Sequence, residues 1–530
     1  MANLSILIGG KAGFGIDKSS LVIAGILNRL GYRIYVYRDY PSLIRGGHTF
    51  SIIRASKDKI AAHIDKVDYL LALNQDAVNF HGSRLKPGAV VIYDSDSVKS
   101  NGIGIPLTNI IKEEAAPEIL RNAGMIGAFC KASGIEWPVL EDAFRKNFAK
   151  DTDLNLKVAR KAYDLAKGSS KIERLDQKSL PLLTGNEATG LGLIRGGLAA
   201  YIAYPMTPAS PILHFMANAA SDFSLKVIHP ESEIAVILMA LGFSYCGKKV
   251  AVGTSGGGFC LMTEGLSFSA MAELPVVIIL GQRPGPSTGL PTYSAQTELH
   301  FALNAGQGEF SRFLVAPGDA EEAYCWSQAA LNISWKFQVP SIILSDKNLG
   351  EGTYSFDIDS VRAIKEEPVE RVFAPRKGAV IKVNSYEHDE SGLTTEDPTE
   401  TKKAQEKRLI KEKYIAEYLE GYETVNVYGN KASKTALLCW GSTKGPVVEA
   451  AEDLGLKVVH VIALSPFPIA KFKEALRGVK KLISVENNAT GQLVRLINRY
   501  GFKADDSILK YDGRPFTVDE LAARIKEVVK

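Results

Sequence analysis

Short apolar runs alternate with longer stretches of helical periodicity along most of the chain, which predicts three α/β blocks. The first block covers about residues 1–180. In it, a buried strand at 4–8 is followed by a glycine-rich turn and a helix at 17–30. The polar stretch 168–178 favours a boundary before the second block. The other elements expected in the first block are strands at 34–37, 69–73 and 89–93 and a helical segment at 141–167.

The second block, 186–360, has the most regular pattern. Its strands and helices follow one another in a βαβαβ order, which is typical of a parallel, doubly wound sheet. Ligands of such sheets bind at the carboxyl ends of the strands. The expected strands are 226–229, 249–253 and 275–280, and the expected helices are 231–246 and 259–273.

The alternation of strands and helices stops in the region 361–425. Residues 396–413 carry dense charge of alternating sign, which indicates a solvated linker helix. A smaller α/β domain follows at 426–530. Its expected elements are strands at 436–440, 458–462 and 482–485 and a final helix at 518–529.

Composition excludes several classes of protein. The 530 residues are 46% hydrophobic and 23% charged, which is average for a globular protein and excludes long disorder. Lys plus Arg number 63 against 59 Asp plus Glu, and no basic run marks a nucleic-acid or membrane face, so neither partner is expected. The longest apolar runs, such as 274–280, are far shorter than the ~20 residues of a membrane-spanning helix.

The N-terminus and the cysteines narrow the class further. The first residues lack the basic flank of a signal peptide. The cysteines are odd in number and widely spaced, with no Cys-x-x-Cys pair, so this chain is not expected to hold a disulfide framework, a ferredoxin-type cluster or a Cys₄ zinc site. We therefore expect a cytoplasmic, multidomain protein. The five cysteines are Cys130, Cys246, Cys260, Cys325 and Cys439.

Residues 204–211 (Tyr-Pro-Met-Thr-Pro-Ala-Ser-Pro) form the most distinctive loop. Its three prolines fix φ and remove backbone donors, so the loop is rigid. A rigid loop with the hydroxyls of Thr207 and Ser210 would suit a small carboxylate or carbonyl ligand. A structural turn with incidental hydroxyls explains the pattern equally well.

Two acidic residues precede the apolar run 234–241. Pro230 suits the first position of a helix, and a carboxylate in the first turn complements the helix dipole. That account fits Glu231. Glu233 adjoins the buried face of the helix, where desolvation would raise its pKa and prepare it for proton transfer.

Two further loops follow expected strands. Thr254-Ser255-Gly256-Gly257-Gly258 lies between a strand and a helix, where glycines let a backbone approach a ligand. It lacks the Gly-Lys-Ser/Thr of a phosphate loop. Arg283 follows the strand 275–280 and enters a Pro-Gly-rich loop, a position that suits bidentate carboxylate binding. A surface arginine is the alternative.

The glycines of the first block do not match the Gly-x-Gly-x-x-Gly pattern of a dinucleotide site. Gly9, Gly10, Gly13 and Gly15 fit a nucleotide loop or a tight packing turn equally well. The segment 45–48 (Arg-Gly-Gly-His) would hold a phosphate or simply form a turn. The histidines show no metal-ligand spacing, so no metal site is predicted.

Together these loops resemble the 2-oxoacid:ferredoxin oxidoreductase family, in the form of an α subunit with the γ domain fused at its N-terminus. The resemblance covers nearly the whole chain. The glycines 9–15 with 45–47 are similar to the γ domain, and 204–211 is similar to the family's highly specific Tyr-Pro-Ile-Thr-Pro-Ser-Ser motif. The other segments in the family's order are 185–188, 231–233, 254–256, Arg283, 289–292, Gln296, 387–390, 486–487 and 491–492.

The chain departs from the family's pattern at three positions. Met206 and Ala209 replace the usual Ile and Ser. Gln307 stands where many members have His, so no role is assigned to it.

The resemblance implies a fold and a chemistry. The γ domain would be followed by a thiamine-diphosphate-type doubly wound domain and a transketolase-C-terminal-like domain. The cofactor would attack a 2-oxoacid, CO₂ would leave, coenzyme A would take the acyl group, and electrons would pass through iron–sulfur clusters to ferredoxin. Glu233 would bond the aminopyrimidine of thiamine diphosphate. Thr207, Ser210 and Arg283 would bind the substrate, and Pro205, Thr254, Ser255 and Gly256 would line the cofactor pocket.

The elements that the chain lacks imply a partner. No Gly-Asp-Gly…Asn element for Mg²⁺ and diphosphate occurs, and no cluster cysteines. By the resemblance, Mg²⁺ and a [4Fe-4S] cluster would be carried by a separate β subunit, and (αβ)₂ is the expected assembly. The γ–α fusion favours 2-oxoglutarate, or a broad range of 2-oxoacids, over strict pyruvate use.

Three alternatives remain open from the sequence. The first alternative is a non-catalytic subunit that only binds its partner. The second is a subunit of an indolepyruvate or branched-chain 2-oxoacid oxidoreductase. The third alternative is a Rossmann-type dehydrogenase that uses the loop 9–15, against which the glycine spacing argues.

Overall fold

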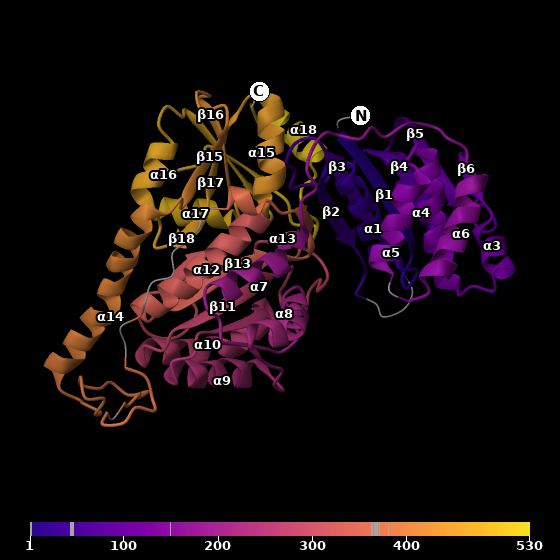
Figure 1. Cartoon of the computed structure of the whole chain (residues 1–530). Helices are drawn as coiled ribbons and strands as arrows, with labels where there is room; N and C mark the ends of the chain where they lie inside the picture. Colours follow the sequence, from indigo (N-terminus) through magenta and orange to yellow (C-terminus); the bar gives the residue numbers. More distant parts are fainter. Residues whose placement is uncertain are drawn as a thin grey trace. The chain divides into compact units, whose positions relative to one another are not determined.

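The protein is described by a computed structural model that covers residues 3–42, 47–148, 150–361, 364, 369, 372–379 and 381–529. Its strands form three sheets with helices around them, which confirms the α/β fold class (Figure 1). The contact pattern divides the chain into two compact units. Unit 1 comprises 1–183, 352–357 and 517–523, and unit 2 comprises 184–351, 358–516 and 524–530.

Unit 1 contains an eight-stranded sheet in the order β6-β5-β4-β1-β3-β2-β14-β7. The strand β3 pairs antiparallel with both β1 and β2, whereas β1 pairs parallel with β4, so the sheet is mixed. The sequence pattern missed β3, β6, β7 and β14. The strands are β1 (Asn3–Lys11), β2 (Arg33–Asp39), β3 (His48–Ser56), β4 (Val67–Ala72), β5 (Leu85–Asp94), β6 (Ile103–Ile105), β7 (Leu182–Thr184) and β14 (Thr353–Ser355).

The helices of unit 1 pack on this sheet around a core of aliphatic and aromatic side chains. The expected helical segment 141–167 is two helices, because the chain turns between them and Asp151 takes a positive φ of 54°. The helices are α1 (Ile16–Arg29), α2 (Gln75–His81), α3 (Leu107–Glu113), α4 (Arg121–Ala132), α5 (Trp137–Asn147) and α6 (Thr152–Leu165).

The glycine loop after β1 is closely packed. A Cβ on Gly10 would lie 3.1 Å from Ile16 Cδ1 and 3.2 Å from Leu73 Cβ. A Cβ on Gly15 would lie 2.4 Å from the Asn122 amide nitrogen, and φ there is 69°. These contacts support the interpretation of a packing turn. Arg45 and Gly46, considered above for phosphate binding, lie outside the described residues.

The central sheet of unit 2 has the order β18-β12-β13-β11-β10-β8-β9. Its strands run parallel except β18, which pairs antiparallel with β12 at the edge. In Figure 1, α9 and α10 lie on one face of this sheet, and α7 and α12 lie on the other. The strands are β8 (Ala200–Ala203), β9 (Lys226–Ile228), β10 (Val250–Ser255), β11 (Val276–Gln282), β12 (Phe313–Val315), β13 (Pro340–Asp346) and β18 (Ala463–Ser465).

The connecting helices follow the predicted βαβαβ order. The glycines 256–258 begin a helix rather than form a loop before it, so α10 starts three residues earlier than the pattern indicated. The helices are α7 (Gly185–Arg195), α8 (Ser210–Phe223), α9 (Glu233–Tyr245), α10 (Gly256–Met271), α11 (Leu299–Asn304), α12 (Ala320–Phe337) and α13 (Lys347–Glu351).

A five-stranded sheet, β15-β17-β16-β19-β20, completes unit 2. One hydrophobic core contains side chains of this sheet and of the central sheet, such as Leu438 and Ile342. The elements are β15 (Val425–Gly429), β16 (Thr435–Trp440), α15 (Lys444–Leu454), β17 (Lys457–Val461), α16 (Ile469–Ala475), β19 (Lys481–Glu486), α17 (Gln492–Asn498) and β20 (Asp506–Leu509). The last helix, α18 (Val518–Val529), is divided, since 518–523 are assigned to unit 1 and 524–529 to unit 2.

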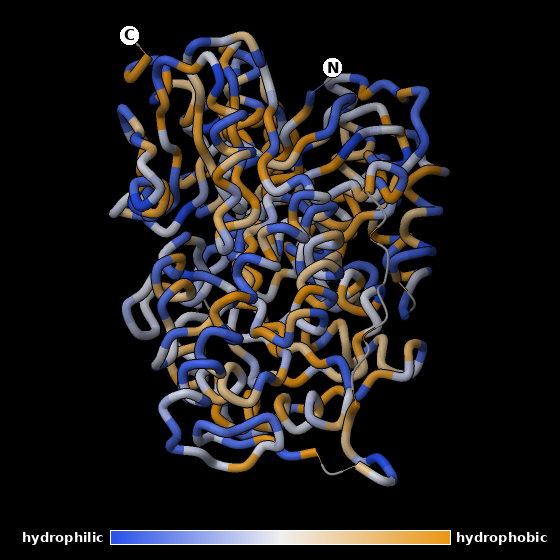
Figure 2. Tube along the Cα trace, turned by 90° about the vertical axis from the view of Figure 1, so that its left-hand side faces the viewer, coloured by the Kyte–Doolittle hydropathy of each residue, from blue (hydrophilic) through white to orange (hydrophobic). Residues whose placement is uncertain are grey.

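The charged segment forms the long helix α14 (Pro398–Tyr418), which is mostly exposed. Its buried residues are Ile415 and Arg408, and the guanidinium of Arg408 pairs with both carboxylate oxygens of Glu387. Hydrophobic stretches along the trace are short and interrupted by hydrophilic ones (Figure 2). Among the described residues, no helix combines the length and the apolar character needed to cross a bilayer.

The strands also cross the segments predicted as domains. The strand β14 lies within 186–360 in sequence but belongs to the sheet of unit 1, and β18 lies within 426–530 but belongs to the central sheet. The predicted division 1–180, 186–360, 361–425 and 426–530 therefore stays a proposal about segments of the sequence.

Candidate active site

The order of strands in the central sheet reverses beside β8. The chain passes from β8 to β9 on one side and then to β10 on the other side of β8. In a doubly wound sheet, this reversal opens a crevice at the carboxyl ends of the strands, where ligands bind. All the site residues predicted from the sequence lie at the end of β10 or in the segments that follow β8, β9, β10 and β11.

The loop after β8 lies across the end of β11. A Cβ on Gly281 would lie 3.1 Å from Pro208 Cδ, so glycine leaves room for the loop. The side-chain amide of Asn186 donates a hydrogen bond to the Pro208 carbonyl at 3.0 Å. Thr207 is half-buried within this loop, and Pro205 is exposed. Ser210 is the first residue of α8 rather than a loop residue.

Arg283 is attached to this same loop. Its Nη1 donates to the Thr207 carbonyl at 2.8 Å, and the residue is only 7% exposed. Burial lowers the pKa of the guanidinium, and the Glu298 carboxylate opposes that shift. The structure thus joins Arg283 to the backbone of Thr207. The other guanidinium N–H groups form no hydrogen bond to the described part of the chain, so they stay available to a ligand.

Glu233 is the first residue of α9, with 4% of its surface exposed. A Cβ on Gly258 would lie 2.3 Å from Glu233 Oε1 and 2.1 Å from Thr254 Oγ1. The carboxyl and the hydroxyl therefore both lie over the first turn of α10. Within the described residues the Glu233 carboxyl forms no hydrogen bond to the chain, and the buried Ser255 hydroxyl has no partner.

Substituting alanine for Gly258 is expected to displace the Glu233 carboxyl, because both contacts are shorter than van der Waals distance. Because the sequence resemblance predicts a catalytic role for Glu233, we expect turnover to fall about 10- to 100-fold, the cost that moving a catalytic group by about 1 Å would have. Gly257→Ala is the matched control, since a Cβ there would meet nothing within 4 Å. Equal turnover of the two variants would contradict the role of this contact.

Glu298 is a site residue that the sequence analysis missed. A Cβ on Gly256 would lie 2.8 Å from Glu298 Oε1, which puts this carboxyl beside the start of α10. Burial raises its pKa to about 7, and Arg283 partly offsets that shift. Its Oε2 is buried without a hydrogen-bond partner among the described residues. A single glutamate before a short helix gives no signal in the sequence.

Several other residues that carry the family resemblance contact the protein chain itself. Gln296 donates to the Trp440 carbonyl at 2.7 Å and accepts from the Asn487 N–H at 2.9 Å. Glu486 accepts from Trp440 Nε1 at 3.2 Å and from the Leu493 N–H at 2.8 Å. The bonds of Gln296 connect the segment after β11 with the five-stranded sheet, whereas those of Glu486 stay within the part of unit 2 that contains that sheet. Gln307 is exposed, and its backbone N–H donates to a serine hydroxyl.

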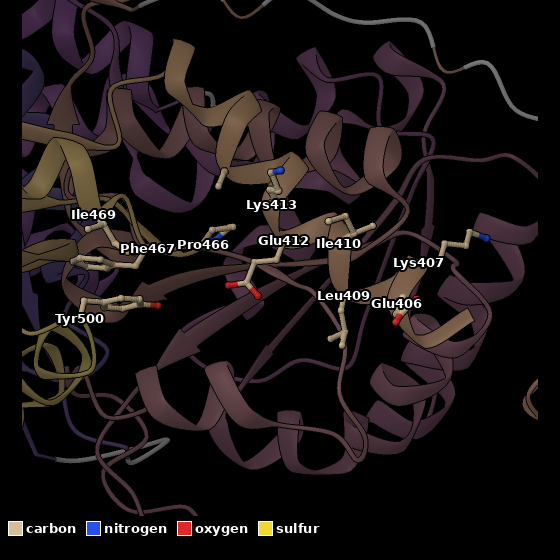
Figure 3. A pocket seen from close by; sticks show the side chains of 11 residues that line it. Glu406, Lys407, Leu409, Ile410, Glu412, Lys413, Pro466, Phe467, Ile469 and Tyr500 are labelled. Atoms are coloured by element: carbon tan, nitrogen blue, oxygen red, sulfur yellow. The ribbon is translucent and has the colours of Figure 1, made fainter. Parts of the chain in front are cut away.

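A groove of about 870 Å³ lies elsewhere in unit 2, along α14. Figure 3 shows side chains of α14 on one side and side chains of 466–469 and Tyr500 on the other. Its lining includes Leu409, Ile410, Phe467 and Ile469, and none of the predicted site residues. The groove is therefore separate from the predicted site residues.

Family models match two segments of the chain. The model described as "Pyruvate flavodoxin/ferredoxin oxidoreductase, thiamine diP-bdg" matches residues 191–410. The model described as "Pyruvate ferredoxin/flavodoxin oxidoreductase" matches residues 5–165.

Full-length relatives are also found. The 2-oxoacid:ferredoxin oxidoreductase subunit alpha of Saccharolobus solfataricus is 30% identical over 99% of this chain and 98% of its own length. The 2-oxoglutarate oxidoreductase subunit KorA of Mycobacterium tuberculosis is 27% identical over 99% of this chain and 91% of its own length. A solved structure of 2-oxoglutarate:ferredoxin oxidoreductase from Magnetococcus marinus, with 2-oxoglutarate, coenzyme A and succinyl-CoA bound, is 28% identical. It covers 100% of both chains with a TM-score of 0.91.

Proposed function

The chain belongs to the 2-oxoacid:ferredoxin oxidoreductase family as an α subunit, and from this premise we propose the reaction in which it takes part. The reaction is the oxidative decarboxylation of a 2-oxoacid with coenzyme A. The bond between the carboxylate and the oxo carbon breaks, CO₂ leaves, and the acyl group becomes a thioester. Two electrons pass to ferredoxin, one at a time.

One observation carries this proposal: a buried carboxyl and a buried guanidinium lie at the same edge of the central sheet, in the segments that follow β9 and β11. Glu233 supplies the carboxyl over Gly258, and Arg283 supplies the guanidinium beside the rigid loop of Thr207. Such an arrangement suits proton handling next to an anchored carboxylate.

Thiamine diphosphate fits the residues around Glu233. A nearly buried carboxyl without a partner in the chain is suited to bond a ring nitrogen of an aminopyrimidine. Thr254, Ser255 and Gly256 would line the same pocket with Pro205. When bound, the cofactor supplies the carbon nucleophile and the electron sink for decarboxylation.

Arg283 would bind the substrate carboxylate with its free N–H groups, as charge-assisted hydrogen bonds. Thr207 and Ser210 would place their hydroxyls beside the same anion. We propose 2-oxoglutarate as the favoured substrate. The relative named for 2-oxoglutarate oxidation and the similar structure that holds 2-oxoglutarate and coenzyme A both support this preference.

The α9–α10 face supports the need for a β subunit. From Ile234 to its end, α9 contains no charged residue, yet Ile234, Leu238 and Met239 are each at least 43% exposed. Leu261 of the adjacent α10 is 49% exposed. A helix that is apolar on every side is normally buried, so this face is suited to a partner. We assign Mg²⁺, the diphosphate contacts and the [4Fe-4S] cluster to that β subunit, in an (αβ)₂ assembly.

Leu238→Glu is expected to weaken assembly with the β subunit by about 100-fold or more, because it buries an unpaired charge in an apolar interface. The control is Leu393→Glu, which changes another exposed leucine in unit 2. Analytical ultracentrifugation of the co-expressed subunits measures both. If Leu238→Glu assembles as the control does, the α9–α10 face is not the interface.

The reaction itself is tested on the complex purified natively around this chain. We would measure coenzyme-A-dependent reduction of a viologen dye across several 2-oxoacids. Turnover with 2-oxoglutarate above that with pyruvate is the expected result. A complex that contains thiamine and iron but reduces no dye would favour a non-catalytic subunit. Turnover that is fastest with indolepyruvate or a branched-chain 2-oxoacid would show that this compound, and not 2-oxoglutarate, is the preferred substrate.

A further inference from the structure

Glu298 is a buried carboxyl at the candidate site to which the proposed reaction gives no role. Its backbone is fixed at the end of β11, since its N–H donates to Gln282 Oε1 at 3.2 Å. The preceding Thr297 hydroxyl donates to the Arg283 carbonyl at 3.4 Å. The side chain then reaches the start of α10, where Oε1 faces Gly256. Oε2 is buried without a partner among the described residues.

The charged groups that face Glu298 come from the ends of two strands. Arg283, after β11, attracts its carboxylate, and Asp346, at the end of β13, repels it. Asp346 is itself held by the Ser294 hydroxyl at 3.2 Å and the Leu349 N–H at 3.0 Å. Along α10, the Glu233 carboxyl lies over Gly258, two residues beyond Gly256. Glu298 therefore lies between one attracting cation, Arg283, and one repelling carboxyl, Asp346.

Burial keeps the Glu298 carboxyl neutral to a higher pH than a free glutamate, with a pKa of about 7. Below that pH the Arg283 charge has no neutralising partner at this position. Above it, the Glu298 carboxylate partly cancels the Arg283 charge.

We propose that Glu298 is a positioning residue that gates Arg283, so that the substrate carboxylate binds when Glu298 is protonated and competes with Glu298 when it is ionised. This inference rests on the proposed function, because it takes Arg283 as the carboxylate anchor. One buried cation stabilises one buried anion well and a second one poorly. Binding of a 2-oxoacid above neutral pH is therefore accompanied by uptake of one proton on Glu298.

The test uses oxamate, an unreactive mimic of a 2-oxoacid, with the natively purified complex. Its dissociation constant is measured by calorimetry from pH 6 to 9, in buffers of different ionisation enthalpy. We expect the constant to be flat below pH 7 and to rise about tenfold per pH unit above it, as one-proton linkage requires. Proton uptake at pH 8 is expected to approach one per site.

Glu298→Gln is expected to bind oxamate without proton uptake and with a constant that does not change above pH 7. Glu298→Asp keeps the carboxyl and should keep the pH dependence with a shifted midpoint. Glu264→Gln, on the exposed side of α10, is the control and should behave as the wild type.

Unchanged proton uptake in Glu298→Gln would overturn the proposal. Loss of the uptake in Asp346→Asn together with its retention in Glu298→Gln would also overturn it, because Asp346 would then be the group that takes up the proton. A wild type without any pH dependence would overturn it as well. Arg283→Ala separates this inference from the proposed function. If that variant binds oxamate as tightly as the wild type, the anchor itself is wrong.

Discussion

Glu233→Gln is expected to lower the turnover of the assembled complex at least about 1000-fold, within the range for loss of a general acid–base group. The carboxyl is almost fully buried at the first turn of α9 and has no hydrogen bond to the described chain. Glutamine keeps the size but cannot hold or release the proton at the aminopyrimidine nitrogen. Single-turnover decarboxylation, followed as CO₂ release from a labelled 2-oxoacid, measures the loss.

The same variant should assemble with its partner and bind the 2-oxoacid normally, because the substitution changes neither the apolar face of α9 nor Arg283. Glu231→Gln is the matched control, since Glu231 lies two residues earlier and is exposed. It should retain full turnover. If Glu233→Gln turns over as fast as Glu231→Gln, Glu233 has no part in the proton transfer.

Arg283→Ala is expected to raise the KM for the 2-oxoacid about 10- to 100-fold, the loss of hydrogen bonds between charged groups. The kcat at saturating substrate should fall less, because the anchor acts on both the ground state and the transition state. Arg283→Lys should lie between, since a lysine supplies charge without the planar fork of donors. Steady-state kinetics across substrate concentration separates KM from kcat.

Arg283 also donates to the Thr207 carbonyl, so alanine would loosen the loop 204–211. Measuring coenzyme A binding in the same variant distinguishes loss of the contact to the substrate carboxylate from wider disorder of the loop. Only wider disorder would lower the affinity for both the 2-oxoacid and coenzyme A. Arg195→Ala, in the exposed part of α7, is the control. An unchanged KM in Arg283→Ala would remove this residue from substrate binding.

The regular part of the fold was accessible from the sequence because local periodicity reports local structure. The predicted strand 275–280 overlaps β11 at 276–280, and the predicted helix 231–246 contains α9. The pairing of distant segments was not accessible. Leu314 pairs with Ser465, and Tyr35 pairs with Tyr354, across long sequence separations that no local pattern encodes.

Some features of the candidate site could likewise be predicted from the sequence, and others could not. The prolines of 204–211, which restrict the backbone, and the glycines of 256–258, which free it, are visible in the sequence alone. What each side chain contacts is not visible. Gln296 proves to be a bridge between the ends of two sheets, whereas Glu298, two residues later, is a buried carboxyl at the site.

The sequence by itself determined the α/β class, the family and the segments that follow the strands, because these depend on periodicity and on motifs of neighbouring residues. Only the tertiary structure decided that these segments meet at the reversal beside β8, that Gly258 makes room for Glu233, and that Glu298 lies within the field of Arg283. Burial and charge interaction depend on distances through space, and the folded chain sets those distances between residues that are far apart in sequence.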